Sequence, residues 1–564
     1  MVVPTTAPHT DPIARTEPVF DTLPVDLLVH RAGEAPDRPA YTHLVDGERE
    51  GITLTYGDLD RRARSIAAVL RDAGAAGERV VVMVADEIGF IESFFGILYA
   101  GAVAVPTYPP LRSNHVQRSR GVIVDSGARF LLAPAKTIDM FAATTDAHFA
   151  DHLRVIAWED LSGPGGDEPP TSVPPGAPCF LQYTSGSTGT PKGVIVTHGN
   201  IAANVSMIAA ALNLGADDPV ASWNPLFHDM GLMTGVFFPL YTGGRAYLMS
   251  PTAFVQRPQR LLRAVARYRA ALITGPNFSY QMLVDSVSQD GRDELDLSSL
   301  RVALNGAEPV RRATLEAFEE TFTPCGLRPG TIMPAYGLAE ATVYVSGGPA
   351  GRSWRSHVER DLVGHGTGAA GQVLRVVSLE TGEHCPAGVS GEIWIAGPHV
   401  TPGYWNPPDP DDTFGTLLED GVPVRFLRTG DAGHLDENGE LYITGRIKDL
   451  IIVRGRNYSP ADLERVAEDA AHPIRVSGAA AFAVEEPGDD RVVIVLEVRS
   501  AGVSNATGVT QRVVRAVGRE TGVVVSEVVL SSTRLPRTTS GKIQRHRARA
   551  DYVHSTRSQD GGQQ

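Results

Sequence analysis

Short apolar runs alternate with segments of helical character along most of the sequence. Residues 79–85 (RVVVMVA) and 102–106 (AVAVP) are apolar runs of strand length, and residues 88–100 between them have the composition of a buried helix. Strands without an alternating polar face are typical of a parallel sheet that helices cover on both faces. The pattern therefore predicts an α/β fold. The same alternation continues at residues 246–249, 259–269, 271–274, 301–304 and 313–320.

The length of the chain requires more than one domain. It has 564 residues, whereas single cores stop growing near ~250–300 residues. The α/β alternation breaks near residues 445–450, and the two strand-like runs, helix and further strand beyond that point indicate a small α+β domain. We therefore expect a flexible lead-in (1–22), a large α/β domain with sub-domains built on parallel and mixed sheets (23–445), a small α+β domain (446–552) and a disordered tail (553–564).

Charge and cysteine usage exclude several classes of protein. The formal net charge is −14, which argues against nucleic-acid binding because that function needs a basic surface for phosphates. The three cysteines are far apart and predict neither a disulfide framework nor a metal site. The N-terminus lacks the apolar core of a signal peptide, and no run approaches the ~18 apolar residues of a spanning helix. These features predict a cytoplasmic protein without a membrane span.

The most specific segment is YTSGSTGTPKG at residues 183–193, which follows a strand-like run. Glycines allow the backbone to approach an anion, N–H groups and hydroxyls donate to it, and a lysine adds positive charge. The segment is not a Walker A loop, in which Gly-Lys-Ser/Thr opens a helix. It predicts a phosphate-binding loop with the candidate ligands Thr184, Ser185, Gly186, Ser187, Thr188, Gly189 and Lys192.

This loop resembles the signature loop of the adenylate-forming superfamily, which includes acyl-CoA synthetases, luciferases and the adenylation domains of peptide synthetases. Further segments that resemble motifs of the superfamily follow in the same order, so that the resemblance covers about residues 25–550. It implies a small mobile C-terminal domain, and ATP and Mg²⁺ as cofactors.

Two turns resemble the adenine-binding motifs of this superfamily, NGAEPV at residues 305–310 and AYGLAEAT at residues 335–342. The resemblance implies that Tyr336 stacks on adenine, that Glu340 holds Mg²⁺ together with Thr188, and that Thr342 lies near the α-phosphate. A metal ion there would offset the charge that repels an incoming carboxylate. The candidate AMP contacts in these turns are Asn305, Gly306, Ala307, Ala335, Tyr336 and Gly337.

Three later segments resemble the ribose, hinge and catalytic motifs. In RTGD (428–431), Asp431 is a natural acceptor for both ribose hydroxyls. In GRIKD (445–449), the resemblance implies that Arg446 also contacts ribose and that Lys448 is the pivot between the domains. In LPRTTSGKIQ (535–544), Lys542 would span the α-phosphate and the substrate carboxylate, where a cation stabilises the transition state more than the separate anions. The arginines that follow, Arg545, Arg547 and Arg549, are expected on the surface.

WNPLFHDMGL at residues 223–232 lies where the superfamily places its acid pocket. Peptide-synthetase domains have an aspartate after the phenylalanine, which binds the amino group of the substrate. Here that position is His228, a catalytic candidate, but Asp229 follows it, so an amino acid remains an alternative substrate. The candidate acyl-pocket residues are Phe227, Met230, Gly231, Asn277 and Phe278.

The sequence is most similar to the fatty acyl-AMP ligases. The resemblance rests on AVAVPTYPP (102–110), LFHDMGL (226–232), SPTAFVQRPQRLL (250–262), GPNFSY (275–280), LNGAEPV (304–310) and DLIIVRGRN (449–457). It implies that the protein adenylates a fatty acid and passes the acyl group to the phosphopantetheine thiol of an acyl carrier protein, in lipid or polyketide/nonribosomal peptide biosynthesis.

One segment departs from that family. Fatty acyl-AMP ligases generally have an insertion downstream of the AYGLAEAT motif that is linked to rejection of coenzyme A, and residues 346–364 are short for that region. Coenzyme A therefore remains an alternative acceptor, and an aryl or β-amino acid remains an alternative substrate. A silent nucleotide-binding scaffold is the non-enzymatic alternative, against which the presence of all five charged site residues argues: Lys192, Glu340, Asp431, Arg446 and Lys542.

Overall fold

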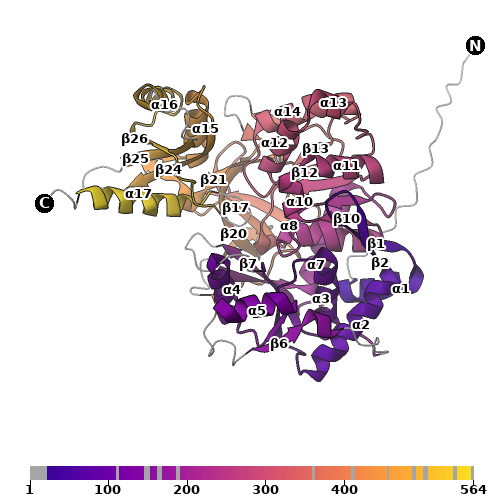
Figure 1. Ribbon diagram of the computed structural model, residues 1–564. Coiled ribbons are helices and arrows are strands. Elements are labelled where there is room, and N and C mark those ends of the chain that lie inside the picture. Colours follow the sequence, from indigo (N-terminus) through magenta and orange to yellow (C-terminus); the bar gives the residue numbers. More distant parts are fainter. Residues whose placement is uncertain are drawn as a thin grey trace, which may run out of the picture.

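The computed structural model of the protein describes residues 22–109, 113–144, 153–161, 168–185, 191–357, 362–407, 413–453, 456–484, 491–498, 506–537 and 543–560. A large domain is built on two seven-stranded sheets and one five-stranded sheet, and a small domain with its own three-stranded sheet lies to one side of it (Figure 1). The predicted fold class is confirmed: the large domain is α/β with mixed sheets and the small one is α+β.

The first seven-stranded sheet holds the phosphate-loop segment at one side. Its five strands from β7 to β6 are parallel, whereas β8 and β18 add antiparallel pairs at the edge. In spatial order the strands are β18 (Tyr404–Trp405), β8 (Pro191–Thr197), β7 (Pro178–Ser185), β4 (Val103–Pro106), β3 (Arg79–Val82), β5 (Phe130–Ala133) and β6 (Arg154–Ala157).

The second seven-stranded sheet ends in the two adenine-motif turns. All its neighbouring strands are parallel except β1 and β2, which form an antiparallel pair. In spatial order the strands are β13 (Ile332–Pro334), β12 (Val302–Asn305), β11 (Leu272–Gly275), β9 (Val220–Ser222), β10 (Ala246–Met249), β1 (Pro39–Leu44) and β2 (Glu50–Thr55).

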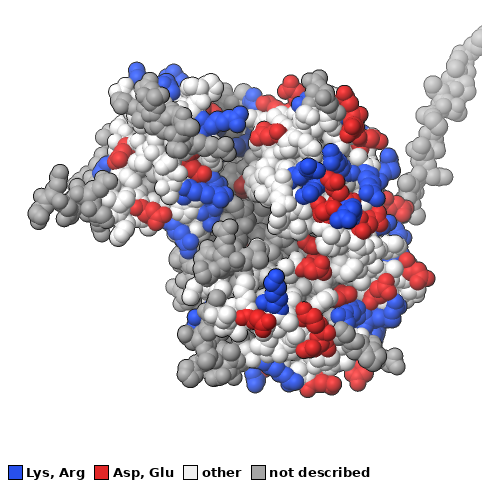
Figure 2. Space-filling view, viewed as in Figure 1, with Lys and Arg blue, Asp and Glu red and all other residues white. Residues whose placement is uncertain are grey.

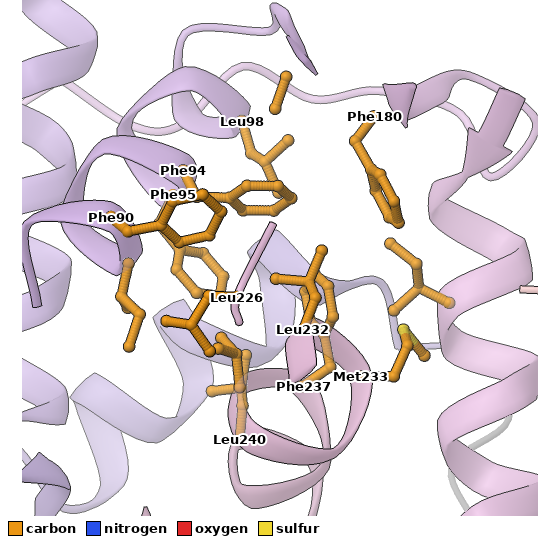
Figure 3. Close-up of a cluster of buried hydrophobic side chains, with 14 of the residues drawn as sticks. Phe90, Phe94, Phe95, Leu98, Phe180, Leu226, Leu232, Met233, Phe237 and Leu240 are labelled. Atoms are coloured by element: carbon orange, nitrogen blue, oxygen red, sulfur yellow. The ribbon is translucent and has the colours of Figure 1, made fainter. Parts of the chain in front are cut away.

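A buried helix, α3 (Glu87–Tyr99), is at the centre of the largest core cluster. All of its residues are buried, including Glu87 and Glu92, and most of them are apolar. The ring of Phe94 lies 5.9 Å from that of Phe180 on the first sheet and 5.9 Å from that of Phe237 below the second. Figure 3 shows these rings together with Leu226, Leu232 and Met233. The helix thus fixes the two sheets relative to each other, and with them the turns at their ends.

The other helices of the large domain surround the two sheets. No helix among the described residues of the chain is long and apolar enough to cross a membrane. The other helices of the large domain are α1 (Pro24–Glu34), α2 (Tyr56–Asp72), α4 (Ser113–Ser126), α5 (Ala135–Thr144), α7 (His198–Leu212), α8 (Asp229–Leu232), α9 (Phe238–Thr242), α10 (Pro251–Gln256), α11 (Gln259–Tyr268), α12 (Asn277–Ser286), α13 (Gln289–Arg292) and α14 (Arg312–Phe322).

An antiparallel sheet completes the large domain and leads to the small one. Its strands are β16 (Val373–Val377), β17 (Gly391–Ala396), β19 (Phe414–Glu419), β20 (Val422–Leu435) and β21 (Leu441–Arg446). Strand β20 places Asp431 directly opposite Arg446 on β21. A short hairpin of β14 (Ser356–His357) and β15 (Leu362–Val363) precedes this sheet.

The small domain has cores of its own, formed by residues between Ile451 and Val553. It contains β22 (Ile451–Val453), β23 (Arg456–Tyr458), α15 (Pro460–Ala470), β24 (Val476–Val484), β25 (Arg491–Val498), α16 (Ala506–Thr521), β26 (Val525–Ser531) and α17 (Arg545–Asp560). The disordered tail expected from residue 553 is wrong for residues 553–560, because α17 continues through them. The ring of Tyr552 packs at a tilt against that of Phe482 of β24, which ties that helix to the sheet.

Three buried histidines make the fold sensitive to acid. Burial lowers the pKa of His198, His365 and His399 from 6.5 to about 4 in each case. The unfolded chain binds more protons than the folded chain between those values, so stability is full above pH ~6.5 and falls toward pH ~4. We expect the free energy of unfolding to fall by about 1–2 kcal/mol per histidine between pH 7 and 5, measured by urea unfolding. His365→Gln should flatten this pH dependence, and an unchanged slope in that variant would contradict the assignment.

Candidate active site

A cleft of about 1440 Å³ lies between the large and small domains and is lined by both (Figure 2). It opens at the carboxyl ends of β7, β12 and β13, where open α/β sheets generally bind ligands. Most of the predicted site residues line it: Thr184, Lys192, Phe227, His228, Met230, Asn277, Phe278, Gly306, Ala307, Ala335, Tyr336, Gly337, Glu340, Asp431, Arg446 and Lys448.

The candidate ribose acceptor, Asp431, is held by two neighbouring side chains in the cleft. The Tyr336 hydroxyl donates to Asp431 Oδ2 at 2.7 Å, and Arg446 Nε lies 3.3 Å from Asp431 Oδ1. Burial and the neighbouring Asp431 raise the pKa of the Tyr336 phenol well above 10, so it stays a neutral donor. Asp431 in turn raises the pKa of Arg446. The three side chains fix one carboxylate where a vicinal diol can donate to it.

The turn before Asp431 is supported by Glu392, a buried residue of β17 that the sequence did not single out. Its carboxylate accepts from the Gly430 N–H at 3.1 Å, from Trp394 Nε1 at 2.9 Å and from Arg428 Nε at 3.2 Å. These contacts hold the RTGD segment in place.

The adenine-motif turns bring backbone close to backbone. A Cβ on Gly337 would lie 1.5 Å from the Val343 carbonyl oxygen, and one on Gly306 would lie 2.7 Å from that of Ala335. Both turns therefore depend on glycine. Asn305 is buried beneath the turn and does not line the cleft; its amide donates to Asn277 Oδ1 at 3.3 Å. Its predicted role as a direct contact is corrected to support of the turn.

The phosphate end combines a lysine and a carboxylate. Lys192 pairs with Thr184 across β7 and β8, and its Nζ lies 5.4 Å from the ring centroid of Tyr404. The Tyr404 hydroxyl donates to Glu340 Oε1. Four predicted loop ligands, Gly186, Ser187, Thr188 and Gly189, lie outside the described residues; the backbone of Ser185 is the end of β7.

Glu340 suits a Mg²⁺ ligand because its carboxylate faces the cleft and Tyr404 engages only one of its oxygens. Thr342, predicted near the α-phosphate, does not line the cleft. It is fully buried, its φ is +65°, and its hydroxyl donates to the His399 carbonyl at 2.7 Å. The structure therefore places the Thr342 side chain in the core behind Glu340, and its role near the α-phosphate stays a prediction.

The opposite end of the cleft is apolar. Phe227 packs edge-on against Tyr108 with 5.1 Å between ring centroids, and Met230 and Phe278 also line the wall. Gly231 lies behind the wall, where a Cβ would be 2.2 Å from the Pro225 carbonyl oxygen. Asn277 accepts from the Arg311 N–H at 3.1 Å and so joins α12 to the adenine turn.

His228 and Asp229 form a local pair at the cleft wall. His228 Nδ1 lies 2.5 Å from Asp229 Oδ1, and the same oxygen accepts from the Met230 N–H at 2.8 Å. The aspartate is thus engaged by its own helix and by the histidine.

The hinge and catalytic segments meet at the small-domain side of the cleft. Lys542 lies outside the described residues, but Arg537 and Ile543 on either side of its loop are bridged and line the cleft. Arg545 is not a surface residue as expected. Its Nε and Nη2 lie 2.6 and 2.7 Å from the Glu464 carboxylate, and its Nη1 lies 3.1 Å from Asp449 Oδ2.

Lysine usage is a sequence signal for the site. The chain has only four lysines among 51 basic residues, namely Lys136, Lys192, Lys448 and Lys542. Lys192 and Lys448 line the cleft, Lys136 lies on α5 outside it, and Lys542 is not among the described residues. Because arginine supplies nearly all the other basic residues, the two lysines at the cleft stand out as compact, flexible cations.

A large α/β domain and a small α+β domain that share a cleft with a ribose acceptor define the class of nucleotide-dependent, acid-activating enzymes. The chain belongs to the AMP-binding enzyme family, whose model matches residues 28–405. Residues 448–560 match the AMP domain of the Disco-interacting protein 2-like family.

Curated relatives and solved structures agree with this assignment. The medium-chain fatty acid–[acyl-carrier-protein] ligase JamA of Moorena producens is 37% identical, over 96% of this chain and 97% of its own. The 4-hydroxyphenylalkanoate adenylyltransferase of Mycobacterium marinum is 36% identical, over 92% and 89%. The Legionella pneumophila fatty acid AMP ligase structure matches with a TM-score of 0.71 and 34% identity, over 94% and 96%. The resemblance to the fatty acyl-AMP ligases is confirmed.

Proposed function

We propose that the protein uses ATP and Mg²⁺ in the cytoplasm to convert a fatty acid to its acyl-adenylate, and then transfers the acyl group to the phosphopantetheine thiol of an acyl carrier protein. The observation on which this rests is the single cleft that joins a diol acceptor at Asp431, the Lys192–Glu340 phosphate end and an apolar wall around Phe227. A cleft of this kind fits the adenylate of an apolar acid.

In the first half-reaction, a carboxylate oxygen attacks the α-phosphorus, the bond to the β-phosphate oxygen breaks, and pyrophosphate leaves. Asp431 and Tyr336 hold the nucleoside, and Lys192 binds the departing phosphates. Lys542 approaches from the small domain and neutralises the carboxylate and α-phosphate as they meet. Mg²⁺, held by Glu340 and Thr188, supplies neutralisation of phosphate charge when it is bound.

In the second half-reaction, the thiol attacks the acyl carbon, the mixed anhydride breaks, AMP leaves, and the thiol proton passes to solvent. The Lys542 loop must withdraw to open a path for the thiol. Rotation of the small domain about Lys448 provides that movement, because the Arg446–Asp431 pair stays with the large domain and the Asp449–Arg545 pair stays with the small one.

The apolar wall around Phe227 favours an acid with an apolar chain as the substrate. His228 and the Met230 N–H both contact Asp229 Oδ1, and the neighbouring wall residues Phe227, Met230 and Phe278 suit the chain of an apolar acid. An aryl-substituted acid is the second candidate, since a relative that spans nearly the whole chain is named a 4-hydroxyphenylalkanoate adenylyltransferase.

The acceptor depends on the short segment between residues 346 and 364. Ser346 bridges both Tyr336 and Gly368, and Gly364 bridges Tyr442, so both ends of the segment lie against the body of the domain. The alignment with JamA extends over 582 positions, more than the 564 residues of this chain, so that relative has stretches that this chain lacks. The carrier-protein name of that relative favours a carrier protein as the acceptor here.

The products identify both substrate and acceptor. We expect protein, ATP, Mg²⁺ and a panel of fatty and aryl-alkanoic acids to release pyrophosphate and, with holo acyl carrier protein, to give an acyl-carrier product detectable by mass spectrometry. Apo carrier protein, which lacks the thiol, is the matched control. If acyl-CoA is the main product, the acceptor assignment is wrong. If no acid leads to release of pyrophosphate, the protein is a silent nucleotide-binding scaffold instead.

A further inference from the structure

Residues 397–405 run between the two charged groups of the phosphate end and contact the segments on which both lie. On one side, the Thr401 N–H donates to the Glu340 carbonyl at 2.9 Å, and the His399 carbonyl accepts from the Thr342 hydroxyl. On the other side, the Ile195 N–H donates to the Gly403 carbonyl at 3.0 Å, and Tyr404–Trp405 pair with β8. We call residues 397–405 the bridging segment.

The bridging segment is also anchored from behind. The buried Asn200 side chain, in the first turn of α7, donates to the carbonyls of Pro398 at 2.8 Å and Val400 at 3.1 Å. Asn200 is itself fixed by reciprocal hydrogen bonds with Thr197 at the helix start. The position of the segment relative to β8 and to the Glu340 turn is therefore set by backbone hydrogen bonds and by two buried side chains, Asn200 and Thr342.

Tyr404 is the one side chain of this segment that contacts both charged groups. Its hydroxyl donates to Glu340 Oε1, and its ring lies beneath the Lys192 ammonium at 5.4 Å. A ring face attracts a cation, and a hydroxyl that donates to one carboxylate oxygen orients the other. Each group is thus held by a different part of the same side chain.

We infer that Tyr404 is a positioning residue that fixes the Glu340 carboxylate and the Lys192 ammonium at a set spacing, so that metal ion and lysine act on the same phosphates. This inference rests on the proposed use of ATP. The hydroxyl orients the Glu340 carboxylate, whereas the ring holds the Lys192 ammonium. The inference therefore predicts changes in ATP binding as well as in rate when Tyr404 is replaced.

ATP binding without any acid tests this division, because no turnover then occurs. Isothermal titration in Mg²⁺ and in EDTA gives the ratio by which the metal tightens ATP binding. In Tyr404→Phe, we expect that ratio to fall about 10-fold, with ATP binding in EDTA unchanged because the ring remains beneath Lys192. In Tyr404→Leu, ATP binding in EDTA should also weaken, by about 3-fold or more.

Trp405→Phe is the matched control, since Trp405 lies on the same short strand but packs away from the cleft, where Arg79 lies over its ring. AMP binding should be equal in the wild type and Tyr404→Phe, because the Asp431 and Tyr336 contacts are retained. If Mg²⁺ tightens ATP binding by the same factor in Tyr404→Phe as in the wild type, the role of Tyr404 is wrong but the proposed function is unaffected. If the wild type does not bind ATP, the proposed function itself is wrong.

Discussion

Replacing Lys542 by alanine is expected to slow acyl-adenylate formation by ~10²–10³-fold with an unchanged melting temperature. The substrate carboxylate and the ATP phosphates are all anions, and the loop between Arg537 and Ile543 is anchored at the cleft where they would meet. Lys192 on β8 lies beside Tyr404, and Arg446 pairs with Asp431, so both of these cations are engaged elsewhere in the cleft. Acid-dependent pyrophosphate release is the measurement.

Lys136→Ala is the matched control for that variant, because Lys136 is the lysine of the chain that lies on α5, away from the cleft. It should retain the wild-type rate. The Lys542→Ala protein should still transfer an acyl group from supplied acyl-adenylate to holo carrier protein, since the lysine has withdrawn by then. Wild-type pyrophosphate release by Lys542→Ala would refute the assignment.

The contiguous features of this protein could be predicted from the sequence. The strand at residues 103–106, the helix at residues 87–99 and the cleft position of Lys192 and Asp431 follow from runs, periodicity and motifs only a few residues long. These signals are local because a buried strand and a Gly-rich turn impose their residue types on neighbours in the chain.

The supporting residues could not be predicted in the same way. Tyr404 meets Glu340 across 64 positions of the sequence, and Arg545 meets Asp449 across 96. No periodicity links such pairs. Thr342 shows the converse: it lies two residues from Glu340 in the same motif, yet its side chain is buried and donates to the His399 carbonyl. A motif therefore indicates the chemistry of a site but not which of its side chains faces the ligand.

Arg545→Ala is expected to lower the free energy of unfolding of the small domain by about 3–5 kcal/mol, because it leaves a buried carboxylate without its cation. Glu464 is 7% exposed and holds Arg545 in two parallel contacts. Burial already raises the pKa of Glu464, and loss of the arginine removes the main opposing influence. The folded chain then binds the proton more tightly than the unfolded chain, so the deficit should be smaller at pH 5 than at pH 8.

A second substitution separates the buried charge from the lost packing. Glu464→Gln in the Arg545→Ala background keeps the oxygen that accepts from the Ala481 N–H at 2.9 Å but removes the charge, so it should recover much of the stability in urea unfolding. No recovery would contradict the charge argument.

Asp449→Ala tests the hinge contact by itself. It leaves the Glu464–Arg545 pair in place, so stability should change by less than about 1 kcal/mol. The residue that follows Lys448 would no longer be tied to the small domain. We expect transfer to the carrier protein to slow relative to adenylation, because the rotation is no longer confined to the two residues between the Arg446 and Asp449 ion pairs. Equal slowing of both half-reactions would mean that the pair supports the fold and not the pivot.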